Sequence, residues 1–576
     1  NQAIAHDLQG EFRWYELANE CNGPEKFIYT ELARSAAAGI RSSEPLASIG
    51  TCGTAGVDIG WFRMQADRGL LHRLDSLVTH PYTWSAPPDQ FGLLSQNETI
   101  NRIIDEQGGM KFHYTTEFGY DHYIEPDKIA RWLPRHFAIA AATDVLRAGL
   151  YAWDGHFGIY DNAHALPAAA SVNAFCVLTQ GHQFAGWLQR DDSVWALVFE
   201  KAGVPLVMAW SPNNKGTFTL PDAVDKITML DLYGNVIPVK SELDEGPYYY
   251  KTNSKEITRQ AWQNQMVQGK PRLRGLLEKS PLKDGEVWKN LAVSEGPSHA
   301  ELVQVLTAWQ PQSNPISLPE QAVIAQAIRQ TILAARMASL TEEKPQYDAA
   351  AGLYSREKWV EILRKTVADD LDLNSLRWLL NQWDRLHDEA AMLTEAGQTN
   401  FAGWLGSLDG VFDTICGRFA EQGERTFFPI WPYLYASVNE NGVYGEHFQF
   451  MLDRPTPVHM RLNSYSARAY EVEVTLELPA DWKCEPAGWK GRIEPGENPD
   501  SLFTVTPGVQ KADKIYALLK AESKPEIRIP YNDFEIMPAI KITARVQKAL
   551  LPAGPLEVEL ENRTGKPVSG FLRIIP

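Results

Sequence analysis

The fold is decided by one stretch near the start of the chain, which reads Trp14-Tyr15-Glu16-Leu17-Ala18-Asn19-Glu20-Cys21-Asn22-Gly23-Pro24. Its first half predicts a β-strand that ends in an Asn-Glu pair, and the residues that follow break the strand into a loop. In a parallel sheet the carboxyl ends of the strands form the face that binds ligands, so Asn19 and Glu20 lie where chemistry is expected. Taken alone, the pair is also explained by a loop carboxylate that helps to cap the next helix.

Short apolar runs alternate with amphipathic stretches from Phe12 to about Gly181, which is typical of βα units around a parallel sheet. Strands are predicted at Arg13–Asn19, Leu46–Gly50, Ser76–His80, Lys111–Glu117 and Gly149–Trp153. Helices are predicted at Glu25–Ala38, Asp127–Arg147 and Leu166–Leu178. Pro24 suits the first turn of the first helix, and Gly39 suits a left-handed cap at its end. The sequence therefore predicts five βα units.

The pattern changes twice further along the chain. Short alternating strands from about His182 to Thr252 predict a small β-sandwich, and helical periodicity follows from Asn253 to about Arg425. Strands return from Thr426 onward. We therefore expect a multidomain α/β protein with a partial TIM-type (β/α)8 barrel over 1–181, a small β-sandwich over 182–252, a helix-rich domain over 253–425 and one or two C-terminal β-sandwich domains over 426–576.

The bulk composition excludes several classes of protein. The 576 residues are 44% hydrophobic and 22% charged, and no run reaches the roughly 18 apolar residues that a membrane span requires. A formal net charge of -17 repels phosphate backbones, so no nucleic-acid partner is expected. The five cysteines follow no metal-ligand or disulfide spacing. Because nucleotide and metalloprotease fingerprints are also absent from the sequence, we expect no cofactor and no metal.

A second glutamate stands in the same kind of position as Glu20. The segment Phe112-His113-Tyr114-Thr115-Thr116-Glu117-Phe118-Gly119-Tyr120 is a strand that delivers Glu117 into a loop containing glycine. Two glutamates at strand ends face the same rim of a parallel sheet. Hydrolysis of a glycosidic bond needs such a pair, because the leaving oxygen must be protonated while negative charge meets the anomeric carbon.

These residues resemble the clan A glycoside hydrolases, a superfamily of retaining (β/α)8-barrel enzymes with xylosidase, iduronidase and cellulase relatives. The resemblance covers residues 12–181 and implies that Glu20 is the acid/base at the end of the fourth strand and Glu117 the nucleophile at the end of the seventh. His80 and Tyr82 look like the family's His/Tyr position, where the tyrosine orients the nucleophile. Trp153 resembles the aromatic floor under the sugar.

The resemblance implies a retaining double displacement on an equatorially linked glycoside, a β-D or α-L sugar, within an oligo- or polysaccharide substrate. Asn19, Trp84 and Tyr120 are expected to contact this substrate. Two other readings stay open. One is a carbohydrate-binding or scaffold protein without turnover, and the other is an enzyme of different chemistry on a related barrel.

Other polar residues near the strand ends carry lower weight. Asp121, His122 and Tyr123 are expected in a loop that either lines the site or packs locally. Asp154 and His156 follow the last strand, with a helix cap and a solvent-facing ring as alternatives to substrate contact. His113, inside a strand, is expected to be a core residue.

The resemblance departs from the family at the start of the chain. Strands one to three of the barrel should precede Glu20, but only nineteen residues do. At roughly 30 residues for each βα unit, about a hundred or more residues are expected upstream, unless another chain supplies the strands or the partial barrel closes on itself. A chain that begins at Asn1 looks like a processed or truncated product, and we expect a secreted or periplasmic protein.

Overall fold

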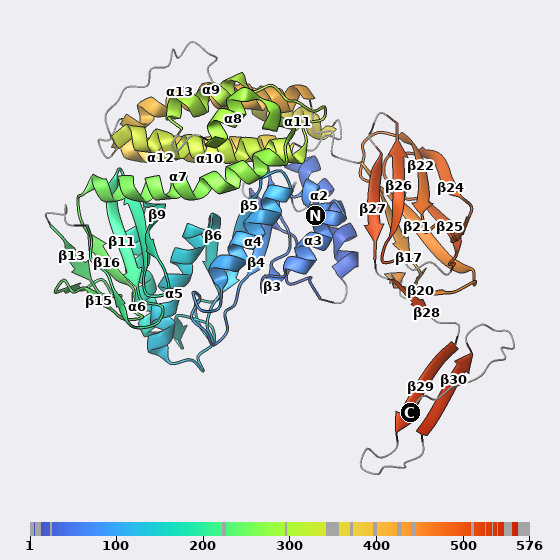
Figure 1. Ribbon diagram of the computed structural model, residues 1–576, viewed down its shortest axis with the longest axis horizontal. Coiled ribbons are helices and arrows are strands. Elements are labelled where there is room, and N and C mark those ends of the chain that lie inside the picture. Colours follow the sequence, from blue (N-terminus) through green and yellow to red (C-terminus); the bar gives the residue numbers. More distant parts are fainter. Residues whose placement is uncertain are drawn as a thin grey trace. The chain divides into compact units, whose positions relative to one another are not determined.

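The structure is a computed structural model that divides into two units, Asn1–Phe427 and Phe428–Pro576 (Figure 1). It describes residues 5, 13–23, 26–221, 226–293, 297–340, 356–368, 373–395, 400–422, 429–438, 444–445, 447–508, 512–522, 524, 526–532, 534–537, 540–546 and 556–562. Within these ranges no helix has the length and apolarity needed to cross a membrane.

A parallel sheet of six strands forms the centre of the first unit, in the order β1-β2-β4-β5-β6 with β3 paired to β4. Its strands are β1 (Trp14–Glu16), β2 (Ser48–Gly50), β3 (Thr54–Ala55), β4 (Ser76–His80), β5 (Phe112–Phe118) and β6 (Val145–Leu150). In the described part of the chain β1 pairs only with β2, and β6 only with β5. The sheet is therefore a half-barrel, and a complete eight-stranded barrel is not present among these residues.

The helices that alternate with these strands are α2 (Lys26–Ser43), α3 (Ile59–Asp67), η1 (Leu70–Arg73), α4 (Leu93–Glu106), α5 (Pro126–Ala142) and α6 (Pro167–Thr179). Two of them differ in length from the prediction: α2 is longer and α5 is shorter. The prediction that Gly39 ends the first helix is wrong, because α2 continues for another turn. That turn buries Ile40 and pairs Arg41 with Asp75 at 2.6 Å.

The last strand of the half-barrel also begins earlier than predicted. Helix α5 ends at Ala142 rather than Arg147, and Asp144 then takes a left-handed conformation with φ of 57°. This turn starts β6 at Val145, so the predicted strand Gly149–Trp153 is wrong in its bounds. Trp153 follows the strand and precedes a small hairpin of β7 (Tyr160–Asp161) and β8 (His164–Ala165).

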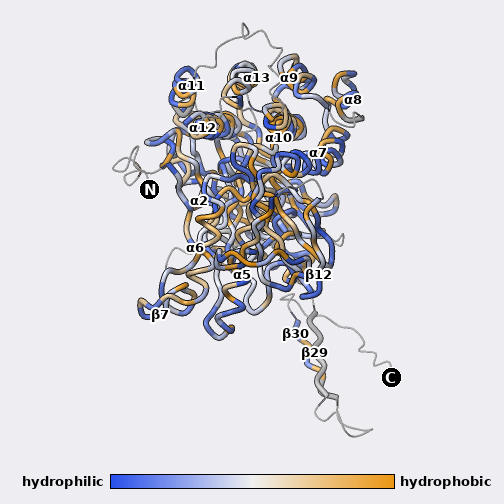
Figure 2. The backbone as a smooth tube through the Cα atoms, turned by 90° about the vertical axis from the view of Figure 1, so that its left-hand side faces the viewer, coloured by the Kyte–Doolittle hydropathy of each residue, from blue (hydrophilic) through white to orange (hydrophobic). Residues whose placement is uncertain are grey.

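The two faces of the half-barrel pack against different parts of the chain. Ile49 and Leu77 face a cluster with α2, α3 and α4, as in a regular βα fold. Val78, Phe112 and Tyr114 instead belong to the hydrophobic cluster of the helix-rich region. Helices α10 and α12 thus cover the face of the sheet that lacks opposing strands. In Figure 2, which colours the backbone by residue hydropathy, hydrophobic residues gather in the middle of this unit.

The helix-rich region consists of long helices layered over the sheets (Figure 1). Its elements are α7 (Lys255–Glu278), η2 (Pro281–Asp284), α8 (Glu286–Val293), α9 (His299–Ala308), α10 (Leu318–Leu340), α11 (Arg356–Ala368), α12 (Asn374–Glu395) and α13 (Asn400–Gln422). The chain from residue 182 to residue 425 shares one compact unit with the half-barrel.

The segment predicted as a small β-sandwich is one antiparallel sheet of six strands, in the order β14-β13-β16-β11-β10-β9, with a ribbon of two more. The sheet strands are β9 (Gln183–Arg190), β10 (Trp195–Lys201), β11 (Val204–Trp210), β13 (Thr228–Leu230), β14 (Val236–Ile237) and β16 (Tyr248–Lys251), and the ribbon pairs β12 (Gly216–Thr217) with β15 (Glu242–Leu243). It differs from a sandwich because helices cover both faces, α7 one and α4, α5 and α6 the other.

The second unit is a two-layered β-sandwich. One sheet has the order β17-β21-β25-β23 and the other β24-β22-β26-β27, and both contribute to a single hydrophobic cluster. Their strands are β17 (Ile430–Tyr435), β21 (Thr456–Ser464), β22 (Tyr470–Glu477), β23 (Lys483–Glu485), β24 (Gly488–Ile493), β25 (Asp500–Thr506), β26 (Ile515–Ala521) and β27 (Ile527–Tyr531). Shorter pairs join β18 (Ser437–Val438) to β19 (Tyr444–Gly445), β20 (Phe448–Met451) to β28 (Phe534–Met537), and β29 (Ile540–Val546) to β30 (Leu556–Asn562).

Candidate active site

A layer of polar side chains lies at the carboxyl end of the half-barrel. Because side chains alternate along a strand, the residue two positions after each core residue points to the same face. Trp14 and Tyr114 meet edge to face, with ring centroids 5.2 Å apart. The residues two positions further along these strands are Glu16 and Thr116, so the sheet changes from apolar to polar within one layer.

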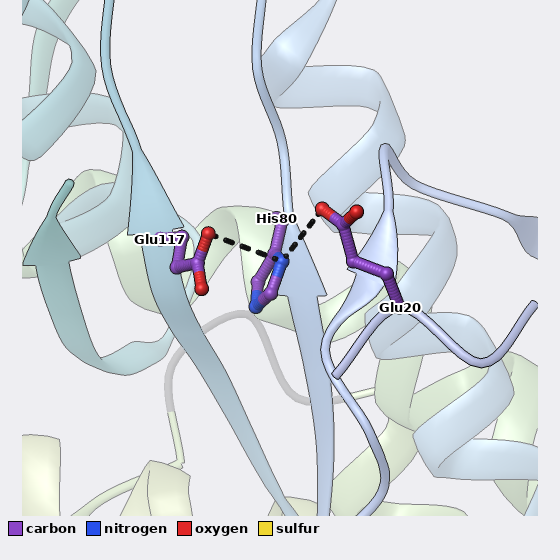
Figure 3. A group of neighbouring side chains, drawn as sticks. All are labelled: Glu20, His80 and Glu117. Carbon is purple, nitrogen blue, oxygen red and sulfur yellow. Dashed lines mark hydrogen bonds and ion pairs between the residues drawn. The ribbon is translucent and has the colours of Figure 1, made fainter. Parts of the chain in front are cut away.

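His80, at the end of β4, is the centre of this polar layer (Figure 3). Its ring is fully buried, and its Nδ1 lies 3.1 Å from Glu20 Oε1 and 3.6 Å from Glu117 Oε2. Its Nε2 lies 3.0 Å from Thr116 Oγ1 and 3.6 Å from Glu16 Oε1. The two glutamates singled out in the sequence are therefore joined through one imidazole, from a strand that lies between theirs.

Glu20 is held by its backbone. Its N–H donates to the carbonyl of Gly53 at 2.8 Å, and Asn19 forms a parallel bridge with the same glycine. Glu20 has a φ of 50°, a left-handed conformation that a glutamate adopts only where its surroundings impose it. The loop thereby turns the Glu20 carboxylate back toward His80, while the Asn19 side chain is exposed.

Glu117 is held by a tyrosine from the segment that follows β4. The hydroxyl of Tyr82 donates to Glu117 Oε2 at 3.0 Å. Burial and then the charge of Glu117 raise the pKa of the Tyr82 phenol, so this hydroxyl stays protonated and remains a donor. One imidazole and one phenol thus lie against the Glu117 carboxylate.

The electrostatic balance at His80 favours its charged form. Burial disfavours the imidazolium, but the carboxylates of Glu16 and Glu20 and the charge of Glu117 outweigh burial, so the pKa of His80 lies above its usual value. Carboxylate and imidazole atoms are also common metal ligands, and those of Glu20, His80 and Glu117 lie within 4.8 Å of one another. The Nδ1 atom is hydrogen-bonded to Glu20 and lies 3.6 Å from the Glu117 carboxylate.

Exposed aromatic rings flank Tyr82. Trp84 is 66% exposed, with its ring centroid 5.9 Å from that of Tyr82, and the ring centroid of the half-exposed Tyr151 lies 6.5 Å from that of Tyr82. Trp153, the aromatic expected to end the last strand, instead stacks on Tyr160 of the small hairpin at 4.6 Å. Tyr151, two residues earlier, and Phe157, whose ring centroid lies 5.7 Å from that of Tyr82, are the aromatic residues of this segment that approach Tyr82.

Tyr120 does not lie where a substrate can reach it. Its side chain is 1% exposed and packs on Trp132, and its hydroxyl accepts a hydrogen bond from Thr83 at 2.9 Å. The expected contact between Tyr120 and substrate is therefore corrected: Tyr120 supports, through Thr83, the loop that carries Trp84. His113 is a core residue as predicted, and burial lowers its pKa to about 3.

The loop residues of lower weight mostly bond to their own loops. Asp121 accepts the backbone N–H of Tyr123, and His122 lies 3.0 Å from the carbonyl of Gly158. Asp154 accepts the N–H groups of Gly155 and Ala163. The contacts of Asp121 and His122 are local packing, one of the two readings that the sequence leaves open for them. Asp154 bonds within its loop and does not cap a helix, and His156 is exposed, as its solvent-facing alternative expects.

Sequence reasoning missed four residues of the site: Glu16, Gly53, Tyr151 and Phe157. A signal for Glu16 was present, because the alternation of β1 places it on the face of Trp14 and one layer below Glu20. Tyr151 was missed because the strand was placed four residues too late. Gly53 acts through its backbone, which no residue-type pattern reveals.

Comparisons with known proteins add little to this geometry. No protein-family model matches the chain. No curated protein matches it either. Among solved structures, an alpha-amylase of Anoxybacillus is similar at 11% identity and a TM-score of 0.29, over 44% of this chain and 62% of that one. A glycosyl hydrolase family 2 member from Bacteroides cellulosilyticus is similar at 7% identity and a TM-score of 0.21, over 92% of this chain and 50% of that one. This chain thus spans half to three fifths of those two proteins, and neither likeness assigns it an activity.

Proposed function

We propose that this chain is a retaining glycoside hydrolase that cleaves an equatorially linked β-D or α-L glycoside by double displacement. The observation that carries the proposal is the closeness of the two carboxylates: one oxygen of Glu20 and one oxygen of Glu117 lie within 4.8 Å of each other, which favours the shorter of the two spacings that glycosidases use. Retaining enzymes place the two groups about 5–5.5 Å apart, whereas inverting enzymes leave roughly 6.5–9.5 Å for a water molecule.

In the first step a Glu117 oxygen forms a bond to the anomeric carbon. The bond from that carbon to the leaving oxygen breaks, its electron pair stays on the oxygen, and the oxygen takes the proton of Glu20. The Tyr82 hydroxyl orients Glu117 for this attack. The product is a covalent glycosyl ester on Glu117 and a free leaving group.

In the second step Glu20, now a carboxylate, takes a proton from water. The water oxygen forms a bond to the anomeric carbon, and the ester bond to Glu117 breaks with its electron pair returning to the carboxylate. Two inversions at the same carbon restore its original configuration. The exposed rings of Trp84 and Tyr151 offer flat apolar faces on which sugar rings can stack.

The test is hydrolysis of a panel of nitrophenyl β-D- and α-L-glycosides, followed by proton NMR of the first anomer released. Hydrolysis with retained configuration supports the proposal, and an inverted first product contradicts it. Glu98→Gln is the matched control for the glutamate variants described below, because Glu98 is a half-exposed carboxylate that pairs with Arg190 on the surface. Binding of oligosaccharides without turnover on any substrate would favour the non-catalytic carbohydrate-binding alternative, for which Trp84 supplies an exposed ring.

The Glu20 role makes its own prediction. Glu20→Ala should slow substrates with poor leaving groups more than activated aryl glycosides, because the latter need less protonation. Added azide should restore the second step by attacking the ester without a general base. Equal losses on both kinds of substrate, without rescue, would remove Glu20 from the acid/base role.

A further inference from the structure

A third carboxylate, Glu16, belongs to the site but takes no part in the two displacements. It lies on β1, and its Oε1 accepts the backbone N–H of Gly53 at 2.7 Å. The same oxygen lies 3.6 Å from His80 Nε2, on the side of the ring opposite Glu20 and Glu117. The Glu16 side chain is partly buried and held in place by this backbone bond.

Gly53 holds the three parts of this arrangement together. Its N–H binds Glu16, and its carbonyl accepts the N–H of Glu20. A Cβ at this position would lie 1.9 Å from His80 Nε2, so only glycine lets the ring come this close. Glu16, His80 and Glu20 are thus placed relative to one another by a single residue without a side chain.

The charged groups that face His80 from the neighbouring elements are all acidic: Glu16 from β1, Glu20 from the loop after β1 and Glu117 from β5. The neutral hydroxyl of Thr116, also on β5, lies 3.0 Å from Nε2. Over the described ranges no lysine or arginine forms an ion pair with any of these three glutamates. The imidazole is therefore the cation available to them within that part of the chain.

We propose that Glu16 is a positioning residue that keeps His80 doubly protonated, so that one imidazolium serves Glu20 and Glu117 together. The inference rests on the proposed function for its catalytic meaning, and on the geometry alone for the effect on His80. Nδ1–H donates to Glu20 beside Glu117, while the Nε2–H points to Thr116 with the Glu16 charge behind it. The active form then holds one proton on Glu20 and two on His80, with Glu117 and Glu16 ionised.

Removal of the Glu16 charge has a direction that follows from simple electrostatics. A negative charge raises the proton affinity of every group near it, so its loss lets the Glu20–His80 pair release a proton at lower pH. The alkaline limb of kcat/KM should therefore move to lower pH in Glu16→Gln. The acid limb should stay near its wild-type position or move slightly lower, because Glu117 loses a repelling neighbour.

The experiment titrates the histidine ring of the full chain by NMR, with ring-labelled histidine and the His80 signal assigned by its absence in His80→Asn. We expect the pKa of His80 to fall by about one pH unit or more in Glu16→Gln, and activity on the alkaline side to fall about tenfold with it. Thr116→Val, which removes a neutral hydrogen-bond partner of His80 Nε2, should shift the pKa of His80 less than Glu16→Gln does. Glu98→Gln should not shift it.

The NMR result separates this inference from the proposed function. An unchanged pKa of His80 in Glu16→Gln overturns the inference even if every glycosidase test succeeds. A lowered pKa supports the control of His80 by Glu16 even if no glycoside is hydrolysed. Should Glu16→Gln fail to fold, Glu16→Asp keeps the charge, and a fall in the pKa of His80 as large as the one expected for Glu16→Gln would also overturn the inference.

Discussion

Strand β4 carries a charged cluster at each of its ends, and the two clusters differ in balance. At the start, the fully buried Asp75 accepts from Arg41 at 2.6 Å, Arg377 at 3.0 Å and the Ile49 N–H at 2.9 Å. At the far end, His80 faces three carboxylates. One carboxylate shared by two cations stands against one imidazole shared by three carboxylates.

The difference indicates that the start of β4 stabilises the fold and that its end is the reactive part of the sheet. Burial alone would raise the pKa of Asp75, but Arg377 and Arg41 lower it below its usual value, so its charge is fixed. Arg377 comes from α12, and this pair therefore ties the helix-rich region to the sheet. At the other end the glutamates are partly exposed, and one imidazole is too little positive charge to keep all three ionised. A proton can therefore move between His80 and these carboxylates.

The largest effect should come from the reactive end. Glu117→Gln removes the nucleophilic charge with little change in shape, so turnover should fall by several orders of magnitude while folding and ligand binding persist. Steady-state rates on an activated aryl glycoside and a binding isotherm measure the two parts. Activity close to that of the wild type would take Glu117 out of the mechanism and erase the contrast between the two ends.

The next effect should come from the stable end and appear in stability rather than rate. Asp75→Ala removes the buried carboxylate that Arg41 and Arg377 share, which should cost about 3–5 kcal/mol of unfolding free energy. Urea unfolding of the full chain measures this loss, with Glu98→Gln as the control. A loss below about 1 kcal/mol would mean that the cluster at the start of β4 does not secure the helix-rich region.

A smaller effect is expected for the orienting tyrosine. Tyr82→Phe removes one hydrogen bond to Glu117, worth roughly 0.5–3 kcal/mol of transition-state stabilisation, so kcat/KM should fall less than for either glutamate. The same assay compares the three variants. A loss as complete as that of Glu117→Gln would give Tyr82 a chemical role of its own.

The smallest effect is a pair of opposite pH dependences, each limited to about 1.4 kcal/mol per pH unit for one proton. The raised pKa of His80 gives stability that is complete below about pH 6.5 and lost as pH rises through the folded value. The lowered pKa of Asp75 gives stability that is present above about pH 3.9 and lost as pH falls through its folded value. Thermal unfolding against pH should therefore lose its alkaline slope in His80→Asn and its acid slope in Asp75→Asn. Slopes identical to wild type would contradict both assignments.

The sequence predicted what local pattern controls. Apolar runs located Ser76–His80 with its observed bounds. Strand ends rich in polar residues led to Glu20, His80 and Glu117, which the structure brings into one cluster, and to Tyr82, which bonds to Glu117. The retaining mechanism assigned to that cluster stays a proposal. Tracking strand alternation through Glu16 would have added the third carboxylate.

The errors of the sequence analysis lie where distant contacts override local preference. Helix α2 passes Gly39 because Arg41 finds Asp75, a residue far along the chain. The chain turns at Asp144, directly after α5, so β6 begins earlier than the sequence analysis placed it. The prediction therefore chose Trp153 as the aromatic at the strand end, whereas Tyr151 is the residue near Tyr82. The sequence also could not predict that helices cover the sheet face at Phe112. Amphipathic periodicity shows that a helix has an apolar face, but it does not show what that face packs against.

The central claim is that Glu117 forms a covalent bond to the sugar, and trapping that bond tests it most directly. The chain incubated with activated 2-deoxy-2-fluoro glycosides of the β-D and α-L series should gain the mass of one fluorosugar. The fluorine slows both steps, and the activated leaving group keeps formation of the ester fast, so the ester accumulates. Peptide mass spectrometry should place that mass on Glu117, and Glu117→Gln should remain unlabelled. Labelling of a different carboxylate, or configuration-inverting hydrolysis of the parent glycoside without any labelled peptide, would contradict the account.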